Sequence, residues 1–195
     1  MCRRDRLGIA WETLHARYPA LSQIAIAGSP GERAEEPGHD LTYLAKNGLV
    51  PGLELPATLY ADMGGSLMAS EAVLQALMHQ RHQSEGVYLE IALSGAAGFL
   101  ALPRAWGLSQ PGAIIGGGHA GSRIYPSRDG RVALAALEPH FALRLCAAAG
   151  IEAASLQAMF EPTAHEAVAA FLLMRTRREL DALAAEKDIP LHTMA

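Results

Sequence analysis

Cysteine is scarce in this chain, and its scarcity argues against two kinds of site. The sequence has two cysteines among 195 residues, Cys2 and Cys146, with no Cys-x-x-Cys or Cys-His spacing around either. A disulfide framework needs several paired cysteines, and a structural zinc site needs four ligands at short spacings. The sequence therefore predicts neither, and a reducing cytoplasmic location is expected. His79 and His82 lie in a polar stretch, which we interpret as exposed helix surface rather than a metal site.

The chain also lacks concentrated positive charge and long apolar runs. It carries 16 Lys and Arg against 20 Asp and Glu, with a net charge of −4. The densest basic group, Arg175, Arg177 and Arg178, is typical of a solvated helix face, so no nucleic-acid partner is predicted. No run of 18 apolar residues occurs, and Met1 to Asp5 lacks the apolar core of a signal peptide. We therefore expect no membrane partner.

Three sequence signatures of nucleotide and acyl chemistry are missing. The glycines at 116–118 do not form Gly-x-Gly-x-x-Gly after a strand, and no Gly-x-x-x-x-Gly-Lys-Ser/Thr segment exists. Ser94-Gly95 lacks the Gly-x-Ser-x-Gly turn of the α/β hydrolases. Any catalytic site must therefore be sought among other residue types.

Helical and strand-like segments alternate along the chain, and half of the residues are hydrophobic. This composition suits one or two compact domains of the α/β class, with a glycine-rich loop at 110–121 separating two regions. An Asp-Gly turn between alternating runs predicts a hairpin around residues 127–130. The expected helices are 11–18, 66–82, 94–106, 139–149 and two or three more within 153–187, and the expected strands are 21–27, 87–93, 122–126 and 131–137.

Three side chains stand at chain breaks where they could carry acid–base chemistry. His39 follows Pro37-Gly38 and is either a loop residue or a catalyst. Asp62 precedes Met63-Gly64-Gly65, where it is either a helix N-cap or an acid beside free amides that could stabilise a developing anion. Glu138, between a strand and a helix, is either a first-turn acid or part of the site. None of these three positions indicates a particular reaction by itself.

Taken in order, the motifs around these residues resemble the family III CoA transferases, most closely the α-methylacyl-CoA racemase branch. The similar segments are GHDLTYLAKNGL, YADMGGSLMASEAVLQAL and RIYPSRDGRVALAALEPHF. The resemblance implies a partial family III fold, with an incomplete Rossmann-like large domain over residues 1–112 and a small α+β domain over residues 113–195. It also implies an acyl-CoA thioester substrate and a homodimer, while the cysteine and histidine spacings predict no metal.

Residue roles follow from the same resemblance. It makes His39 and Asp62 the acid–base pair at the α-carbon and places Glu138 beside the histidine, while Tyr43, Gly64 and Gly65 are expected to bind CoA. In the transferase branch the aspartate instead attacks the thioester as a nucleophile. The family pattern also implies that a preceding part of the large domain is missing. A racemase, a CoA transferase, a truncated non-catalytic subunit and a CoA-ester binding module thus all stay open.

Overall fold

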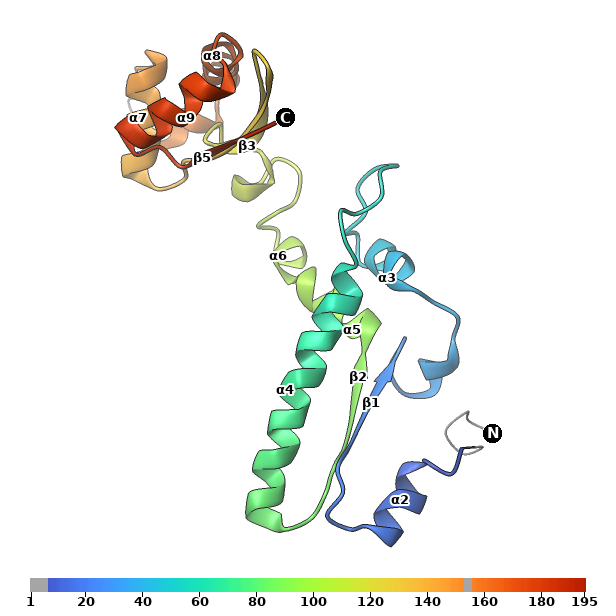
Figure 1. Cartoon of the computed structure of the whole chain (residues 1–195). Coiled ribbons are helices and arrows are strands. Elements are labelled where there is room, and N and C mark those ends of the chain that lie inside the picture. Colours follow the sequence, from blue (N-terminus) through green and yellow to red (C-terminus); the bar gives the residue numbers. More distant parts are fainter. Residues whose placement is uncertain (1–6, 153–155) are drawn as a thin grey trace. The chain divides into compact units, whose positions relative to one another are not determined.

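The computed structural model describes residues 7–152 and 156–195. Their contacts divide into two compact units, the first ending at Leu102 and the second beginning at Pro103. Figure 1 shows the elements of each unit. The predicted domain boundary at residue 112 falls in the glycine-rich segment just beyond the point where the contacts divide the chain.

The first unit is built on a parallel strand pair with a long helix against it. Strand β1 pairs with β2 in parallel, from Gln23 beside Tyr88 to Ala27 beside Ala92. Parallel neighbours need a long crossover, and here it contains α3 and the long helix α4, which runs beside the strands in Figure 1. The elements are α2 (Trp11–Arg17), β1 (Gln23–Ala27), η1 (Gly31–Glu35), α3 (Asp40–Lys46), α4 (Tyr60–Gln83), β2 (Tyr88–Ala92), α5 (Leu93–Leu100) and α6 (Leu102–Ala105), whose last residues lie beyond the boundary.

Small residues make the buried face of α4. Ala61, Gly65, Ala72 and Ala76 recur at helical spacing and are buried. Their short side chains let the helix backbone come close to its neighbours, whereas the larger apolar residues point outward. A small cluster of Tyr43, Leu44, Ala61 and Ala97 joins α3, α4 and α5. This cluster fixes the start of α3 relative to the start of α4.

The second unit packs helices against an antiparallel sheet in the order β3-β4-β5. Its core includes the fully buried side chains of Val132, Leu145, Val168, Leu172 and Leu180. The elements are η2 (Ile114–Gly116), β3 (Ser122–Ser127), β4 (Gly130–Ala135), α7 (Pro139–Ala149), η3 (Leu156–Phe160), α8 (Pro162–Leu173), α9 (Arg177–Lys187) and β5 (Leu191–Met194).

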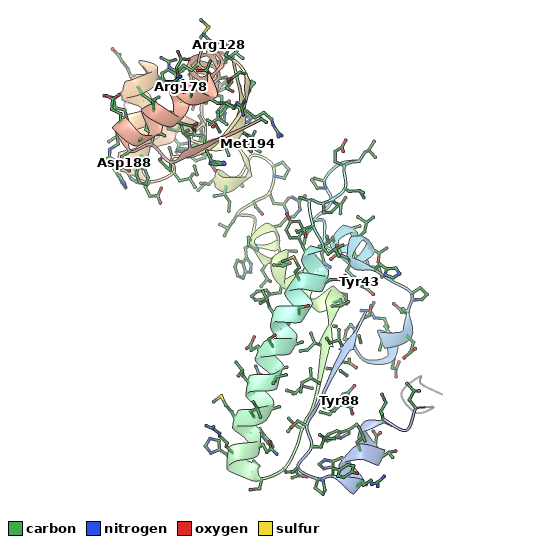
Figure 2. The ribbon with its side chains drawn as sticks, in the orientation of Figure 1. Tyr43, Tyr88, Arg128, Arg178, Asp188 and Met194 are labelled. Carbon is green, nitrogen blue, oxygen red and sulfur yellow. The ribbon has the colours of Figure 1, made fainter. Side chains whose placement is uncertain are left out.

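Most predicted elements of this unit are confirmed, with two differences. The hairpin is present, but Ser127 pairs with Gly130, so the two residues of the turn are Arg128 and Asp129 rather than Asp-Gly. Strand β5 was not predicted, and it pairs with β4 from Arg131 beside Met194 to Leu134 beside Leu191. Figure 2 marks Met194 in this strand. Its four residues are too few to show a strand period.

Candidate active site

His39 occupies the N-cap position of α3 with an extended backbone, φ −141° and ψ 168°. The Thr42 hydroxyl fixes this backbone, because it accepts from His39 N at 3.0 Å and donates to His39 O at 2.8 Å. The residue itself is exposed. The imidazole therefore stands at a fixed point of the chain while remaining accessible to a ligand.

Tyr43 explains the glycines that precede His39. Its ring is buried, with 2% of the residue exposed, and Figure 2 marks it on α3. A Cβ on Gly38 would lie 2.6 Å from the ring, and one on Gly28 would lie 2.2 Å from the Tyr43 hydroxyl oxygen. Both glycines thus make room for this ring. The predicted contact of Tyr43 with CoA stays a prediction beside this packing role.

Asp62 lies inside helix α4, so its interpretation as the N-cap was wrong. The helix begins at Tyr60 with Leu59 as N-cap, which makes Asp62 the third helical residue. The apolar pattern that begins at Leu67 placed the predicted start six residues too late, because Leu59 gives no capping signal. A partly buried carboxylate in the first turn still benefits from the helix dipole.

The first-turn amides of α4 are not available to an anion, which corrects a second expectation. Tyr60 N donates to Thr58 O at 3.2 Å, and Met63 N donates to Leu59 O at 2.9 Å. The amides of Ala61 and Asp62 donate to Asp40 Oδ1 at 2.6 and 3.0 Å. Because protein oxygens satisfy all four donors, this helix start cannot stabilise an enolate through them.

Asp40 is the residue that sequence reasoning missed. It is the first residue of α3, is 5% exposed, and caps α4 from a separate element. Its Oδ1 bonds the amides of the second and third helical residues, the two that an N-cap side chain ordinarily satisfies. No local sequence signal indicates this role, because the capped amides lie 21 and 22 positions further along the chain.

Gly64 and Gly65 face α5. A Cβ on Gly65 would lie 2.4 Å from Leu93 Cδ2, and one on Gly64 would lie 3.4 Å from the Ala96 Cβ. These glycines allow α4 and α5 to pack closely near Asp62. Their predicted role in CoA binding stays a prediction.

Glu138 belongs to the second unit, where it is the exposed N-cap of α7. Its side chain makes no capping hydrogen bond, and Pro139 takes the first helical position. The helix therefore begins where the sequence predicted. The pairing of Glu138 with His39 stays a prediction.

The glycine-rich segment folds into tight turns beside a hollow of about 600 Å³. A Cβ on Gly116 would lie 1.8 Å from Gln110 O, and one on Gly118 would lie 2.0 Å from Gly112 O, so both turns require glycine. The hollow is lined by Pro111, Gly112, Ile115, Gly116, Gly117, Ser122, Arg123 and Ile124.

A histidine pair holds the end of this segment. The buried His119 accepts from Gly121 N at its Nδ1, 3.0 Å away, and His165 Nε2 lies 2.9 Å from Gly118 O. Burial lowers the pKa of His119 below its ordinary value, and the neighbouring His165 lowers it further. His119 thus favours the neutral form that can accept the Gly121 amide.

Within residues 7–152 and 156–195, no group of three or more His, Cys, Asp or Glu side chains is arranged to hold a metal ion. No helix in the same two ranges is long and apolar enough to cross a membrane.

Comparison with known proteins places these residues in a family. The model of CoA-transferase family III matches residues 2–195. A CaiB/baiF CoA-transferase family protein of Caenorhabditis elegans is 28% identical over 156 residues, covering 70% of this chain and 46% of that protein. The alpha-methylacyl-CoA racemase of Mus musculus is 29% identical over 170 residues, covering 78% of this chain and 45% of that protein. The chain spans about half the length of these relatives.

Solved structures show the same fold. A hypothetical protein of Mycobacterium tuberculosis, Rv3272, has a TM-score of 0.80 at 18% identity, covering 97% of this chain and 57% of that one. A CAIB/BAIF family protein of Brucella suis has a TM-score of 0.75 at 18% identity, covering 98% of this chain and 57% of that one. The predicted partial fold is confirmed.

Proposed function

Because this chain belongs to CoA-transferase family III, we propose that it interconverts the two configurations at the α-carbon of a 2-methylacyl-CoA. His39 and Asp62 act as the two acid–base groups. One observation carries this proposal: the Asp40 carboxylate, next to His39 in the chain, bonds the Asp62 amide at 3.0 Å. This bond brings together the starts of the two helices that bear the proposed acid and base. The racemase among the relatives agrees with it.

The reaction needs a base on one face of the α-carbon and an acid on the other. Starting from one enantiomer, the neutral His39 imidazole removes the α-proton, and the C–H electron pair moves into the thioester to give an enolate. A protonated Asp62 then delivers its proton to the opposite face. The other enantiomer reacts with the roles reversed, and general acid–base catalysis of this kind contributes about 10²- to 10⁴-fold.

The remaining predicted residues support this pair in the proposal. Glu138 is the third catalytic residue that the family resemblance implies. Tyr43, Gly64 and Gly65 support the CoA-binding surface from behind, through the packing of Tyr43 near His39 and of the two glycines against α5.

CoA transfer is the second candidate, favoured by the family description and by the name of the Caenorhabditis elegans relative. In that reaction the Asp62 carboxylate attacks the thioester carbonyl carbon. The C–S bond breaks, CoA leaves as the thiolate, and an acyl–aspartyl anhydride forms. The thiolate then attacks the Asp62 carbonyl carbon, which releases the first acid and leaves CoA as a thioester of Asp62. The second acid attacks this thioester, expels the thiolate and forms a second anhydride. Attack of the thiolate on the acyl carbon of that anhydride gives the new acyl-CoA and frees Asp62.

Deuterium incorporation at the α-carbon of a 2-methylacyl-CoA in heavy water tests the proposal. We expect the wild-type chain to catalyse exchange and inversion, and His39→Asn and Asp62→Asn each to lose about 10²- to 10⁴-fold in rate. Glu71→Gln is the matched control, because Glu71 lies on the exposed surface of the same helix as Asp62.

The outcomes separate the candidates. Exchange with inversion that depends on both residues supports the racemase. CoA transfer between two acids that requires Asp62 and proceeds without α-proton exchange supports the transferase. A folded wild-type chain that does neither is a non-catalytic subunit or a CoA-ester binding module. Binding of the thioester would identify the binding module.

A further inference from the structure

We infer that Asp40 is a positioning residue that sets the spacing between the two proposed acid–base groups. This inference rests on the proposed function of His39 and Asp62. Asp40 itself is buried, with 5% of the residue exposed, so it is placed to act through its neighbours rather than on the substrate.

Asp40 connects the two helix starts directly. The residue follows His39 directly, and its Oδ1 accepts from Ala61 N at 2.6 Å and from Asp62 N at 3.0 Å. One carboxylate oxygen thus joins the beginning of α3 to the first turn of α4, across 21 and 22 positions of sequence.

Beside the apolar cluster of Tyr43, Leu44, Ala61 and Ala97, the two bonds of Asp40 are the hydrogen bonds that join these helix starts among the described residues. Leu59, the N-cap of α4, has no side-chain acceptor, and the intervening residues 47–59 contain no helix or strand. The start of α3 is fixed locally by Thr42, which bonds His39 and not α4. The Asp40 carboxylate therefore carries the polar link between the two sites.

A loosened link between the helix starts would affect inversion and retention differently. In a two-base reaction, inversion requires both groups at their proper faces, whereas exchange with retention requires a single group that takes up and returns a hydrogen on one face. A shift of about 1 Å can cost 10²-fold in rate. Losing the Asp40 link should therefore lower inversion more than it lowers exchange with retention.

Asp40→Ala tests this through the ratio of inversion to retention during deuterium exchange of a 2-methylacyl-CoA of known configuration. We expect the ratio to fall at least tenfold, together with faster amide hydrogen exchange at Ala61 and Asp62 measured by NMR. Asp40→Asn keeps an acceptor oxygen on a side chain of the same length. We expect it to restore most of the inversion-to-retention ratio and most of the amide protection at Ala61 and Asp62. A loss of folded protein alone would lower both rates equally and leave the ratio unchanged.

Asn47→Ala is the matched control, because it removes a side-chain bond at the other end of α3, from Asn47 Nδ2 to Tyr43 O at 2.8 Å. We expect this variant to keep the wild-type ratio. If Asp40→Ala does not fold, Asp40→Ser replaces it, because serine keeps an acceptor on a shorter side chain. We expect the same fall in the ratio of inversion to retention.

Two results would overturn the inference, and they are distinguishable. An Asp40 variant whose Ala61 and Asp62 amides exchange faster, but whose ratio is that of the wild type, overturns the positioning role alone. A wild-type chain that protects these amides but exchanges no α-hydrogen overturns the proposed function and, with it, the role given to Asp40.

Discussion

Two neighbouring residues, His39 and Asp40, show how a single position in sequence separates surface from interior. His39 is exposed and Asp40 is buried, because the first turn of α3 directs one outward and the other against α4. A buried carboxylate is stable only when hydrogen bonds replace the water that it loses, and two α4 amides supply them. The acidic residue with the clear structural role is thus the one beside the histidine.

His119 gives a prediction of pH dependence at the same scale. Its pKa lies below the ordinary value of 6.5, first because the ring is buried and second because His165 is near. As the pH falls through 6.5, the unfolded chain binds a proton that the folded unit still excludes, so stability decreases until the folded pKa is reached. In that window the ratio of unfolded to folded protein should rise by up to about tenfold per pH unit.

Denaturant unfolding of His119→Asn at a series of pH values checks this, since asparagine does not titrate. We expect the curve of stability against pH to be flatter below pH 6.5 than in the wild type. His140→Asn, at an exposed position of α7, should keep the wild-type curve. An unchanged slope in His119→Asn would show that another group is responsible.

At the scale of elements, the turn before β2 depends on a glycine that no motif indicates. Gly86 is buried, and its amide donates to Pro19 O at 2.8 Å. A Cβ there would lie 2.0 Å from Leu21 O, a backbone atom that cannot rotate away. The close approach of the chain at Gly86 to the segment from Pro19 to Leu21 places β1 and β2 in register.

Gly86→Ala should therefore destabilise the first unit by about 1–3 kcal/mol, a typical cost of overpacking. The measurement is the midpoint of urea unfolding followed by circular dichroism. Gly52→Ala provides the comparison, because a Cβ at Gly52 meets nothing within 4 Å and should leave the midpoint nearly unchanged. Equal midpoints for the two variants would contradict the close approach.

At the scale of the whole molecule, α4 carries large apolar residues on the side opposite its small buried ones. Leu67 is 75% exposed and Leu74 is 61% exposed. We call this surface the outer face of α4, and it consists of Met63, Leu67, Leu74, Leu77 and Met78. Contiguous exposed apolar surface is typical of an interface. We propose that it is buried between two copies of this chain, in line with the homodimer that the resemblance implies.

The double variant Leu67→Glu and Leu74→Glu should shift the chain from dimer to monomer in sedimentation velocity, because it places charges in the proposed interface. Leu143→Glu makes the same change at an exposed position of α7 and should leave the sedimentation coefficient unaltered. A wild-type monomer would refute the dimer, and a dimer that tolerates the double variant would place the interface elsewhere.

Local signals in the sequence were enough for much of the fold. Pro139 marked the start of α7, and the run between Val87 and Leu93 marked β2. The start of α4 was misplaced because its cap comes from Asp40 instead of from the residues before the helix. The availability of the α4 amides was misjudged for the same reason.

By itself, the sequence determined the α/β class, the periodic helices and the family, because these depend on residues close together in the chain or on motifs in a fixed order. Tertiary structure alone decided which donors at α4 are occupied, which face of that helix is exposed, and that Asp40 links the two proposed acid–base sites. A hydrogen bond across 21 positions leaves no periodic trace in the sequence, since its partners are brought together only by folding.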